Sequence, residues 1–344
     1  MSLPVAVVPE VLAEYGGLTH RELTRYLPDR EPRRHLYEPL SDYPLRGGKR
    51  LRPSLCIATA RAFGAALDDA LLSAAAIELF HNALLIHDDI EDGSEERRGR
   101  PTMHRLHGVP IAINAGDTLT LMSLRPLMDN RARLGPRLSL RILEETERMA
   151  RESAEGQALE LGWRRDNVLD LGEDDYLRMI LKKTCWLLAI HPMRVGASIA
   201  GVGERRLDDF VRFGFFLGAA FQIQDDLLNL TGEREEYGKE PWGDLWEGKR
   251  TLMLLHLHRH AGPAERRRLT TILDRPREEQ TAEDIRWVRE RMDLLGSIEH
   301  ARHVAHGLAG AALHEYSLLF GSLPDSRDKR FVAELVRYML ERPR

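Results

Sequence analysis

The strongest constraint on the fold is a set of long segments in which apolar residues recur every three to four positions. Residues 69–87 are rich in Ala and Leu, with few β-branched residues and no glycine or proline, a composition that favours a helix. Residues 212–223 (RFGFFLGAAFQI) are apolar around most of the circumference that a helix would present. Because such a helix must be covered on all sides, the pattern predicts an all-α bundle with central apolar helices.

Other segments with the same period place the remaining elements. They cover residues 137–161, 173–202, 205–230, 250–260, 281–293 and 297–320, and the alternation typical of strands is nearly absent. Glycine- and proline-bearing stretches separate them, at 44–48, 93–101, 162–167, 201–203, 232–243 and 324–326, as expected of turns. Because no repeat or low-complexity linker divides the chain, we expect one large helical domain over residues 1–344.

Composition limits the partners and the compartment. The 344 residues are 43% hydrophobic and 30% charged with a net charge of −4, so no overall positive field favours nucleic acid. Cys56 and Cys185 lie in apolar stretches, which favours buried thiols in a reducing compartment over a disulfide. The N-terminus does not resemble a signal peptide, and no uninterrupted apolar run approaches the roughly 18 residues of a membrane span. We therefore expect a cytoplasmic protein.

Two aspartate-rich segments stand at the ends of two apolar helices. They are residues 88–92 (DDIED) and residues 225–229 (DDLLN). In each, oxygen-bearing side chains at positions i and i+4 share one helix face, because a helix advances about 3.6 residues per turn. Like charges stacked in this way need neutralising partners. Hard divalent cations, which take oxygen ligands together with waters and phosphates, suit this role.

Basic segments alternate with the acidic ones along the chain. They are residues 46–53 (RGGKRLRP), 95–102 (EERRGRPT), 182–184 (KKT) and 238–250 (GKEPWGDLWEGKR). Guanidinium groups bind phosphate oxygens in pairs, and glycines allow close backbone approach. Each segment alone is also explained as a basic helix start, a surface loop or a pair of snorkelling lysines. Together, acids for metals and bases for phosphates predict an apolar ligand with a phosphorylated head.

The order of these motifs resembles that of the trans-isoprenyl diphosphate synthases, or polyprenyl synthetases, and within them the geranylgeranyl diphosphate synthases. The resemblance covers about residues 40–255 and rests on GGKRLRP, HDDIED, RRGRPT, NAGD, LKKT, FQIQDD and GKEPWGDLWEGK. It implies a homodimeric enzyme of the isoprenoid synthase fold with a central apolar cavity. It also implies a Mg²⁺-dependent, head-to-tail (1′-4) condensation of isopentenyl diphosphate with an allylic diphosphate, releasing pyrophosphate.

The resemblance further implies a role for each motif residue. Two Mg²⁺ ions would be held by Asp88, Asp89 and Asp92, and a third by Asp225 with Asp226 and Asn229, with Mn²⁺ as a candidate substitute. The allylic diphosphate would be bound by Arg97, Lys183, Thr184, Gln222, Lys239 and Lys249. Isopentenyl diphosphate would be bound by Gly48, Lys49, Arg52, His81 and Arg98. The expected catalytic residues are Asp88, Asp89, Asp92, Arg97, Lys183, Gln222, Asp225, Asp226 and Lys239.

Two of these positions have a second interpretation. His81 also fits an ordinary histidine on a core helix, so its substrate role is one of two readings. Asn229 stands where many family members have a third aspartate. Its amide oxygen can still face a metal or a metal-bound water, so we interpret it as tolerated variation.

Product length is expected to depend on the helix that leads into the first acidic segment. Leu84 and Ala83 lie four and five residues before Asp88, about one turn deeper in the cavity. In the family, aromatic residues at these positions stop growth at fifteen carbons, and neither residue is aromatic here. Phe80, one further turn down, is then expected to form the floor, with Met122 as a second contributor. We expect geranylgeranyl diphosphate, with a longer polyprenyl or a farnesyl product as alternatives.

Two other functions remain as alternatives. A class I terpene cyclase needs metal ligands at i, i+4 and i+8, and Asp225, Asn229 and Glu233 have that spacing. However, Gly232 is expected to end the helix first, and a cyclase has no use for a second diphosphate pocket. A non-catalytic subunit of a heteromeric synthase is the other alternative, but such subunits typically lose aspartates that this chain retains. The region after residue 260 carries no motif and is expected to complete the bundle.

Overall fold

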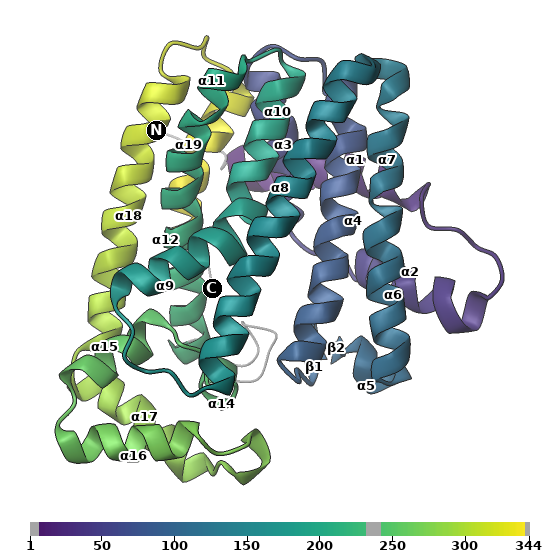
Figure 1. Ribbon diagram of the computed structural model, residues 1–344. Helices are drawn as coiled ribbons and strands as arrows, with labels where there is room; N and C mark the ends of the chain where they lie inside the picture. Colours follow the sequence, from purple (N-terminus) through teal and green to yellow (C-terminus); the bar gives the residue numbers. More distant parts are fainter. Residues whose placement is uncertain (1–6, 232–241, 341–344) are drawn as a thin grey trace.

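The computed structural model describes residues 7–231 and 242–340, and most of both ranges is helical (Figure 1). The first half supplies α1 (Val7–Thr24), α2 (Glu38–Leu45), α3 (Leu51–Ala62), α4 (Leu67–Glu91), α5 (Met103–His107), α6 (Val109–Met122), α7 (Leu124–Asp129) and α8 (Arg131–Arg165). The second half supplies α9 (Glu173–Ile180), α10 (His191–Ile199), α11 (Glu204–Leu207), α12 (Asp209–Thr231), α14 (Gly243–Trp246), α15 (Leu252–His260), α16 (Pro263–Leu273), α17 (Ala282–Leu294), α18 (Ser297–Phe320) and α19 (Arg327–Leu340).

The remaining elements are short. Two π-helical segments are η1 (Arg33–Tyr37) and η2 (Leu181–Ile190), and η3 (Arg277–Glu279) is a 3₁₀ turn. Within the described residues, the sheet structure is limited to an antiparallel hairpin of β1 (Glu96–Arg97) and β2 (Arg100–Pro101). The predicted all-α class is therefore confirmed. The predicted helix over 173–202 is divided into α9, η2 and α10, and its middle turn is wider than an α-helix.

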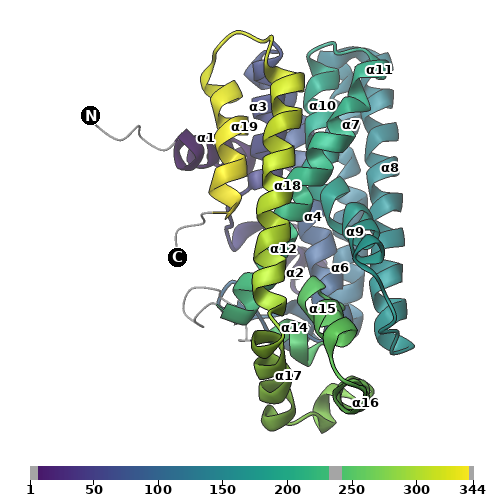
Figure 2. The ribbon, with the colours of Figure 1, turned by 90° about the vertical axis from the view of Figure 1, so that its left-hand side faces the viewer.

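The long helices run side by side, and the motif-bearing ends lie at one end of the bundle. Figure 1 shows α4, α8, α12 and α18 roughly aligned, with the β1–β2 hairpin and α14 near the lower end. The 90° view in Figure 2 agrees, and it places α16 and α17 beyond that end as an extension. The C-terminal ends of α4 and α12 thus approach each other where both acidic segments occur.

The apolar central helices are buried by packing against neighbours. Helix α4 packs against α1, α3, α6 and α7, and α12 packs against η2, α18 and α19. Among the described helices, α4 has the length and hydropathy of a membrane span, but 72% of its apolar window is buried inside the bundle. Its composition is thus the one expected of a central core helix.

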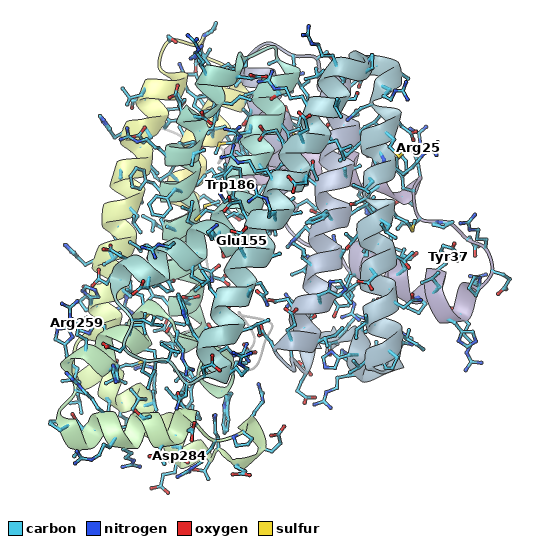
Figure 3. All side chains as sticks on the ribbon, in the orientation of Figure 1. Arg25, Tyr37, Glu155, Trp186, Arg259 and Asp284 are labelled. Atoms are coloured by element: carbon cyan, nitrogen blue, oxygen red, sulfur yellow. The ribbon has the colours of Figure 1, made fainter. Side chains whose placement is uncertain are left out.

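Side chains fill the spaces that the ribbon leaves between helices. Figure 3 shows this packing, with Trp186 inside the bundle. The Arg148 guanidinium lies 4.6 Å from the centroid of the Trp186 ring. Cys56 and Cys185 are both buried free thiols, as the sequence predicts. Burial raises the pKa of both thiols, so neither is an activated nucleophile.

Candidate active site

A cavity of about 680 Å³ lies between α4, α8, η2 and α12. Its apolar lining is formed by Leu84, Leu85, Ala150, Met179, Ile180, Leu187 and Phe221. Its charged and polar lining includes Arg52, His81, Asp88, Glu91, Arg97, Arg98, Glu160, Tyr176, Lys183, Thr184, Gln222, Asp225, Asp226, Asp244 and Lys249. The cavity therefore combines an apolar chamber with a charged end, as the sequence predicts.

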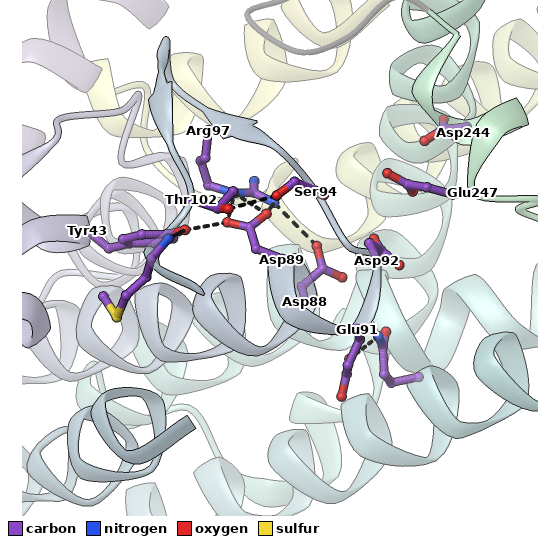
Figure 4. A network of polar contacts seen from close by, with 12 residues as sticks. Tyr43, Asp88, Asp89, Glu91, Asp92, Ser94, Arg97, Thr102, Asp244 and Glu247 are labelled. Atoms are coloured by element: carbon purple, nitrogen blue, oxygen red, sulfur yellow. Dashed lines mark hydrogen bonds and ion pairs between the residues drawn. The ribbon is translucent and has the colours of Figure 1, made fainter. Parts of the chain in front are cut away.

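The three aspartates of the first acidic segment have different surroundings, although Asp88 and Asp89 share the guanidinium of Arg97 (Figure 4). Asp88 lines the cavity, where its Oδ1 is 3.6 Å from Lys183 Nζ. Asp92 caps the end of α4 and forms ion pairs with Arg164 Nη1 at 2.6 Å and Lys249 Nζ at 3.0 Å. Burial would raise the pKa of Asp92, but the charges of Lys249, Lys183 and Arg164 outweigh it and hold this pKa well below its ordinary value. Asp92 is therefore anionic at neutral pH.

Asp89 is turned away from the cavity and is fully buried. It accepts a hydrogen bond from the Tyr43 hydroxyl at 2.5 Å and two from Arg97 Nε at 2.7 and 2.8 Å. Because protein donors engage both carboxylate oxygens, this orientation does not provide the metal ligand predicted for Asp89. Asp88 and Glu91 line the cavity, and Asp92 is paired with the cavity cation Lys249.

The second acidic segment follows the same division. Asp225 is partly exposed at the cavity, whereas Asp226 is buried and accepts hydrogen bonds from Tyr176 Oη at 2.8 Å and Gln222 Nε2 at 2.7 Å. Burial, with the nearby charge of Asp244 second, raises the pKa of Asp226 well above its ordinary value. Asn229 is also buried, and its Oδ1 accepts from the backbone N–H of Asp244 at 3.1 Å. Asn229 thus holds the start of α14, a role that differs from the metal support predicted for it.

Lys249 connects the first acidic segment to two acids at α14, Asp244 and Glu247. Its Nζ lies 3.0 Å from Asp92 Oδ2, 2.7 Å from Glu247 Oε2 and 3.5 Å from Asp244 Oδ1. Burial disfavours its charge, but Asp92 and Glu247 outweigh burial and hold the pKa of Lys249 well above its ordinary value. A lysine that follows the second segment in sequence is therefore a counterion for the first segment.

Helix η2 brings a further lysine to the charged end. Lys183 forms ion pairs with Asp88 and with Glu160 of α8. Helices α8 and η2 can approach this closely because Gly156 has no side chain: a Cβ there would lie 2.2 Å from the backbone nitrogen of Lys183. Thr184 Oγ1 donates to Gln222 Oε1 at 3.0 Å, so η2 also fixes the orientation of the Gln222 amide.

A second basic cluster combines Arg52, His81 and Arg98. Arg52 Nη1 is 3.1 Å from His81 Nε2, and Arg52 Nε and His81 Nδ1 are buried without a hydrogen-bond partner among the described residues. The Arg98 guanidinium lies against Gly48, where a Cβ would come within 2.7 Å of it. Burial, followed by the charge of Arg52, lowers the pKa of His81 well below its ordinary value, so His81 is neutral. Buried donors that lack partners are suited to a polar anionic ligand.

The polyprenyl synthetase family model matches residues 33–292, which contain all these motifs. The chain belongs to the polyprenyl synthetase family. It is 33% identical over 335 residues to a short chain isoprenyl diphosphate synthase of Methanothermobacter thermautotrophicus, with 97% of this chain and 98% of the relative covered. It is 32% identical to a geranylgeranyl pyrophosphate synthase of Geoglobus acetivorans, with 98% and 99% covered. An octaprenyl diphosphate synthase of Escherichia coli is 32% identical, with 87% of each chain covered.

Solved structures confirm the fold of this polyprenyl synthetase. The geranylgeranyl pyrophosphate synthetase of Pyrococcus horikoshii superposes with a TM-score of 0.85 at 32% identity, with 97% of this chain and 99% of that chain covered. A geranylgeranyl pyrophosphate synthase of Corynebacterium glutamicum, complexed with isoprenyl diphosphate and magnesium, gives 0.83 at 26% identity, with 99% and 100% covered. The bundle is thus an isoprenoid synthase fold, and the chain is a prenyltransferase that makes trans-prenyl diphosphates.

The residues predicted to set product length lie on different sides of α4. Leu84 lines the cavity, and Phe80 is buried in the same apolar cluster as Leu187 and Met149. Ala83 is fully buried in another cluster, which also includes Met122. The structure therefore keeps Leu84 and Phe80 near the cavity and turns Ala83 away from it.

Another predicted residue lies apart from the cavity lining. Lys49 is exposed, with its Nζ 5.7 Å from the ring centroid of Tyr338, and it is not part of the cavity lining. Lys239 lies outside the described residues. Sequence reasoning missed the partners Tyr43, Tyr176, Glu160, Arg164, Asp244 and Glu247. Asp244 and Glu247 lie between the two lysines of the motif GKEPWGDLWEGK. Acids so close to Lys249 in the sequence could have indicated its ion-pair partners.

The acids at the cavity fit hard divalent cations that share their coordination with a substrate. Among the described residues, no group of three or more His, Cys, Asp or Glu side chains is arranged to hold a metal by itself. The cavity acids Asp88 and Asp225 offer only oxygen, and Asp92 lies one helical turn after Asp88. Mg²⁺ commonly binds through one or two carboxylates and completes its coordination with waters and substrate phosphates, so these few carboxylates suffice.

Proposed function

We propose that this prenyltransferase makes geranylgeranyl diphosphate by head-to-tail condensation of isopentenyl diphosphate with an allylic diphosphate. The observation that carries the proposal is the α4 wall of the cavity. Leu84 stands at the lining, and Phe80 is buried one turn below it. A leucine leaves open a passage that an aromatic ring would close, and Phe80 then ends that passage.

The length of the cavity supports the same product. On α8 the lining runs from Leu161 to Ala150, a distance of about 16 Å at about 1.5 Å per residue. An extended chain of three isoprene units spans about 15 Å, given C–C bonds of about 1.5 Å. The cavity therefore suits a fifteen-carbon primer, and one addition to it gives twenty carbons.

Mg²⁺ is the cation we propose for the charged end, with Asp88, Asp92 and Asp225 as its protein ligands. When bound, it supplies Lewis-acid stabilisation of the diphosphate leaving group. Asp88 and Asp92 retain their charge because neighbouring lysines and arginines lower their pKa against the effect of burial. They are therefore available as anionic ligands at neutral pH.

The side chains around these acids bind and activate the allylic diphosphate. Lys183, Lys249 and Arg97 line the cavity and stabilise the negative charge that grows on pyrophosphate as its bond to C1 breaks. The double bond of isopentenyl diphosphate then forms the new C–C bond at C1, and a proton leaves to the departing pyrophosphate. The apolar walls exclude water, which would otherwise capture the allylic cation.

The cluster of Arg52, His81 and Arg98 is the proposed pocket for the diphosphate of isopentenyl diphosphate. Its buried, unpartnered N–H groups support this assignment, because a phosphate oxygen would satisfy them. A cyclase, which takes one diphosphate substrate, has no use for such a second pocket. The position of Asn229, engaged with the backbone of Asp244, also argues against the ligand set of a cyclase.

We also propose that the enzyme is a homodimer joined through α6 and α7. Large apolar side chains are exposed there, namely Val109, Ile113, Leu121 and Met128 at 44, 44, 69 and 60%. Exposed apolar surface of this kind is typical of a protein interface. Light scattering of the purified chain should give twice the mass of one chain, and charged residues at Leu121 and Met128 should give the monomer.

The experiment that tests the function is product analysis with primers of different length. The purified enzyme is incubated with Mg²⁺, isopentenyl diphosphate and dimethylallyl, geranyl or farnesyl diphosphate, and the products are separated by chromatography. Twenty-carbon diphosphate from every primer supports the proposal. A fifteen-carbon end product or a product beyond twenty carbons would overturn it, a hydrocarbon would indicate a cyclase, and no turnover would indicate a non-catalytic subunit.

A pair of substitutions tests the α4 wall directly. Leu84→Phe should shorten the main product to fifteen carbons, because the ring would occupy the passage at the lining. Leu84→Met is the matched control, since it keeps the volume with a flexible side chain, and it should keep the twenty-carbon product. The same product from all three proteins would show that another residue sets the length.

A further inference from the structure

In each acidic segment the second aspartate is hydrogen-bonded to a buried tyrosine from another helix, and only the second pair, Tyr176 and Asp226, lines the cavity. In the first, Tyr43 Oη lies 2.5 Å from Asp89 Oδ2. In the second, Tyr176 Oη lies 2.8 Å from Asp226 Oδ2. The tyrosines come from α2 and from α9, 46 and 50 residues away from their partners. Two unrelated helices thus place a phenol on the same position of each segment.

The first pair is connected to a cation of the cavity. The carboxylate of Asp89 holds Arg97 through its Nε, and Arg97 lines the cavity. Tyr43 is itself fixed, because its hydroxyl oxygen accepts from the backbone N–H of Met103 at 3.2 Å. The Arg97 side chain is therefore held by a chain of contacts that begins at α5 and ends in the cavity.

The second pair is connected to an amide of the cavity. Asp226 accepts from Gln222 Nε2 at 2.7 Å, and Gln222 Oε1 accepts from Thr184 at 3.0 Å. With both ends of the amide engaged, Gln222 has one orientation at the lining. Tyr176, which is 1% exposed, fixes the carboxyl on which this arrangement depends.

We propose that Tyr43 and Tyr176 are positioning residues for prenyl transfer. Through Asp89 and Asp226, each holds one side chain at the diphosphate end of the cavity, Arg97 in the first segment and Gln222 in the second. The inference rests on the proposed function, because it takes Arg97 and Gln222 as groups that bind the allylic diphosphate. The second aspartate of each segment is then a support for a substrate-binding side chain.

The test replaces each tyrosine by phenylalanine, which removes one hydroxyl and keeps the ring. Tyr43→Phe and Tyr176→Phe should each raise the KM for the allylic diphosphate about tenfold, the effect of losing one buried hydrogen bond. The kcat should change less than twofold, and so should the KM for isopentenyl diphosphate. Farnesyl diphosphate serves as the allylic substrate.

Tyr15→Phe is the matched control. Tyr15 Oη donates to the buried Asp328 at 2.5 Å and joins α1 to α19, and neither helix contributes to the cavity lining. This variant should lose thermal stability to a similar degree with an unchanged KM. A purely structural role for Tyr43 and Tyr176 predicts the same behaviour for all three variants, and that result would overturn the proposal. A raised KM in only one of the two would overturn the shared role.

A second measurement separates positioning from metal binding. The Mg²⁺ concentration for half-maximal rate should stay within twofold of wild type in Asp89→Asn and Asp226→Asn, and should rise in Asp88→Asn and Asp225→Asn. A tenfold rise in either of the first two variants would make that aspartate a metal ligand and overturn the inference. Wild-type enzyme that elongates no primer would instead contradict the proposed function, so the two failures are distinguishable.

Discussion

The two acidic segments have the same spacing and the same division of labour, but their charges are compensated differently. In the first, Asp89 is held by the guanidinium of Arg97, and Asp92 is held by Arg164 and Lys249. In the second, the donors to Asp226 are a phenol and an amide, and the third position is the neutral Asn229. The first segment is thus a dense set of charges, whereas the second has fewer charges and a carboxyl with a raised pKa.

Two segments with the same spacing of oxygen-bearing side chains can therefore have their negative charges compensated in different ways. A carboxylate paired with a buried guanidinium is costly to remove, because its partner would be left as an uncompensated charge. A carboxyl that burial drives toward its neutral form loses less when an amide replaces it. Substitutions of equal size in the two segments should therefore have unequal effects.

The largest effect is expected for Asp88→Ala. It removes the cavity-lining aspartate of the first segment and leaves Lys183 paired with Glu160 alone of its two acidic partners. We expect turnover to fall roughly 10³-fold, which corresponds to about 4 kcal/mol of transition-state stabilisation. Steady-state kinetics at saturating Mg²⁺ measure it. Wild-type turnover by this variant would remove Asp88 from the proposed ligands.

The next effect contrasts the two buried aspartates. In metal-free protein, Asp89→Asn should lower the free energy of unfolding by about 3 kcal/mol, because it leaves the buried Arg97 with only the 3.4 Å contact to Asp88. Asp226→Asn should cost below about 1 kcal/mol, because the amide keeps an acceptor for a neutral donor. Urea titrations of both variants give the comparison. Equal costs would mean that the charges of Asp89 and Asp226 are compensated in the same way.

Lys249 provides a test of how the negative charges of Asp92 and Glu247 are compensated. Lys249→Met should lower the free energy of unfolding by about 2 kcal/mol, because it leaves the acids Asp92 and Glu247 close together without their shared cation. Mg²⁺ should restore much of this stability by neutralising the same acids. Lys249→Arg is the control and should resemble wild type. No response of the Met variant to Mg²⁺ would disprove that metal and lysine compensate the same charges.

The pH dependence of stability should also distinguish the segments in metal-free protein. Because the pKa of Asp226 is raised by burial, its contribution is fully present below the unfolded value of about 3.9 and is lost as pH rises through the folded value. The pKa of Asp92 is lowered, so its contribution is present above about pH 3.9 and is lost as pH falls. The cost of Asp226→Asn should shrink from pH 5 to pH 8, whereas that of Asp92→Asn should not. Urea titrations at the two pH values check the sign.

Much of the fold followed from the sequence because apolar periodicity reports burial directly. The segments predicted at 69–87, 281–293 and 297–320 correspond to α4 at 67–91, α17 at 282–294 and α18 at 297–320. The division of the predicted 173–202 helix was missed, because η2 keeps its apolar side chains in nearly the same pattern as an α-helix. The period of apolar residues shows which face of a helix is buried, but it does not distinguish an α-helix from a π-helix, which has about one residue more per turn.

The sequence predicted many residues of the candidate site, but not which of their side chains face the cavity. Neighbouring helix residues point about 100° apart, and of the pairs Asp88/Asp89 and Leu84/Ala83 only Asp88 and Leu84 line the cavity. The family resemblance assigned the same role to both members of each pair, whereas the structure places only one member of each pair at the cavity. Tyr43 and Tyr176 could not be found from spacing, because their partners are 46 and 50 residues away. Only tertiary packing brings them together.

The smallest effect is expected for Asn229→Asp, which makes the second segment resemble the usual family pattern. Aspartate keeps the acceptor for the backbone N–H of Asp244, so the start of α14 should be preserved. Its extra negative charge adds repulsion near Asp226 and Asp244, which should lower the metal-free stability by about 0.5 kcal/mol. Turnover should stay within about threefold of wild type, since Asn229 faces a backbone donor and not the cavity. Asn229→Leu is the contrasting variant, because it removes the acceptor and should lower both stability and turnover further. A large gain in Mg²⁺ affinity in the Asp variant would show instead that the side chain at position 229 reaches the metal.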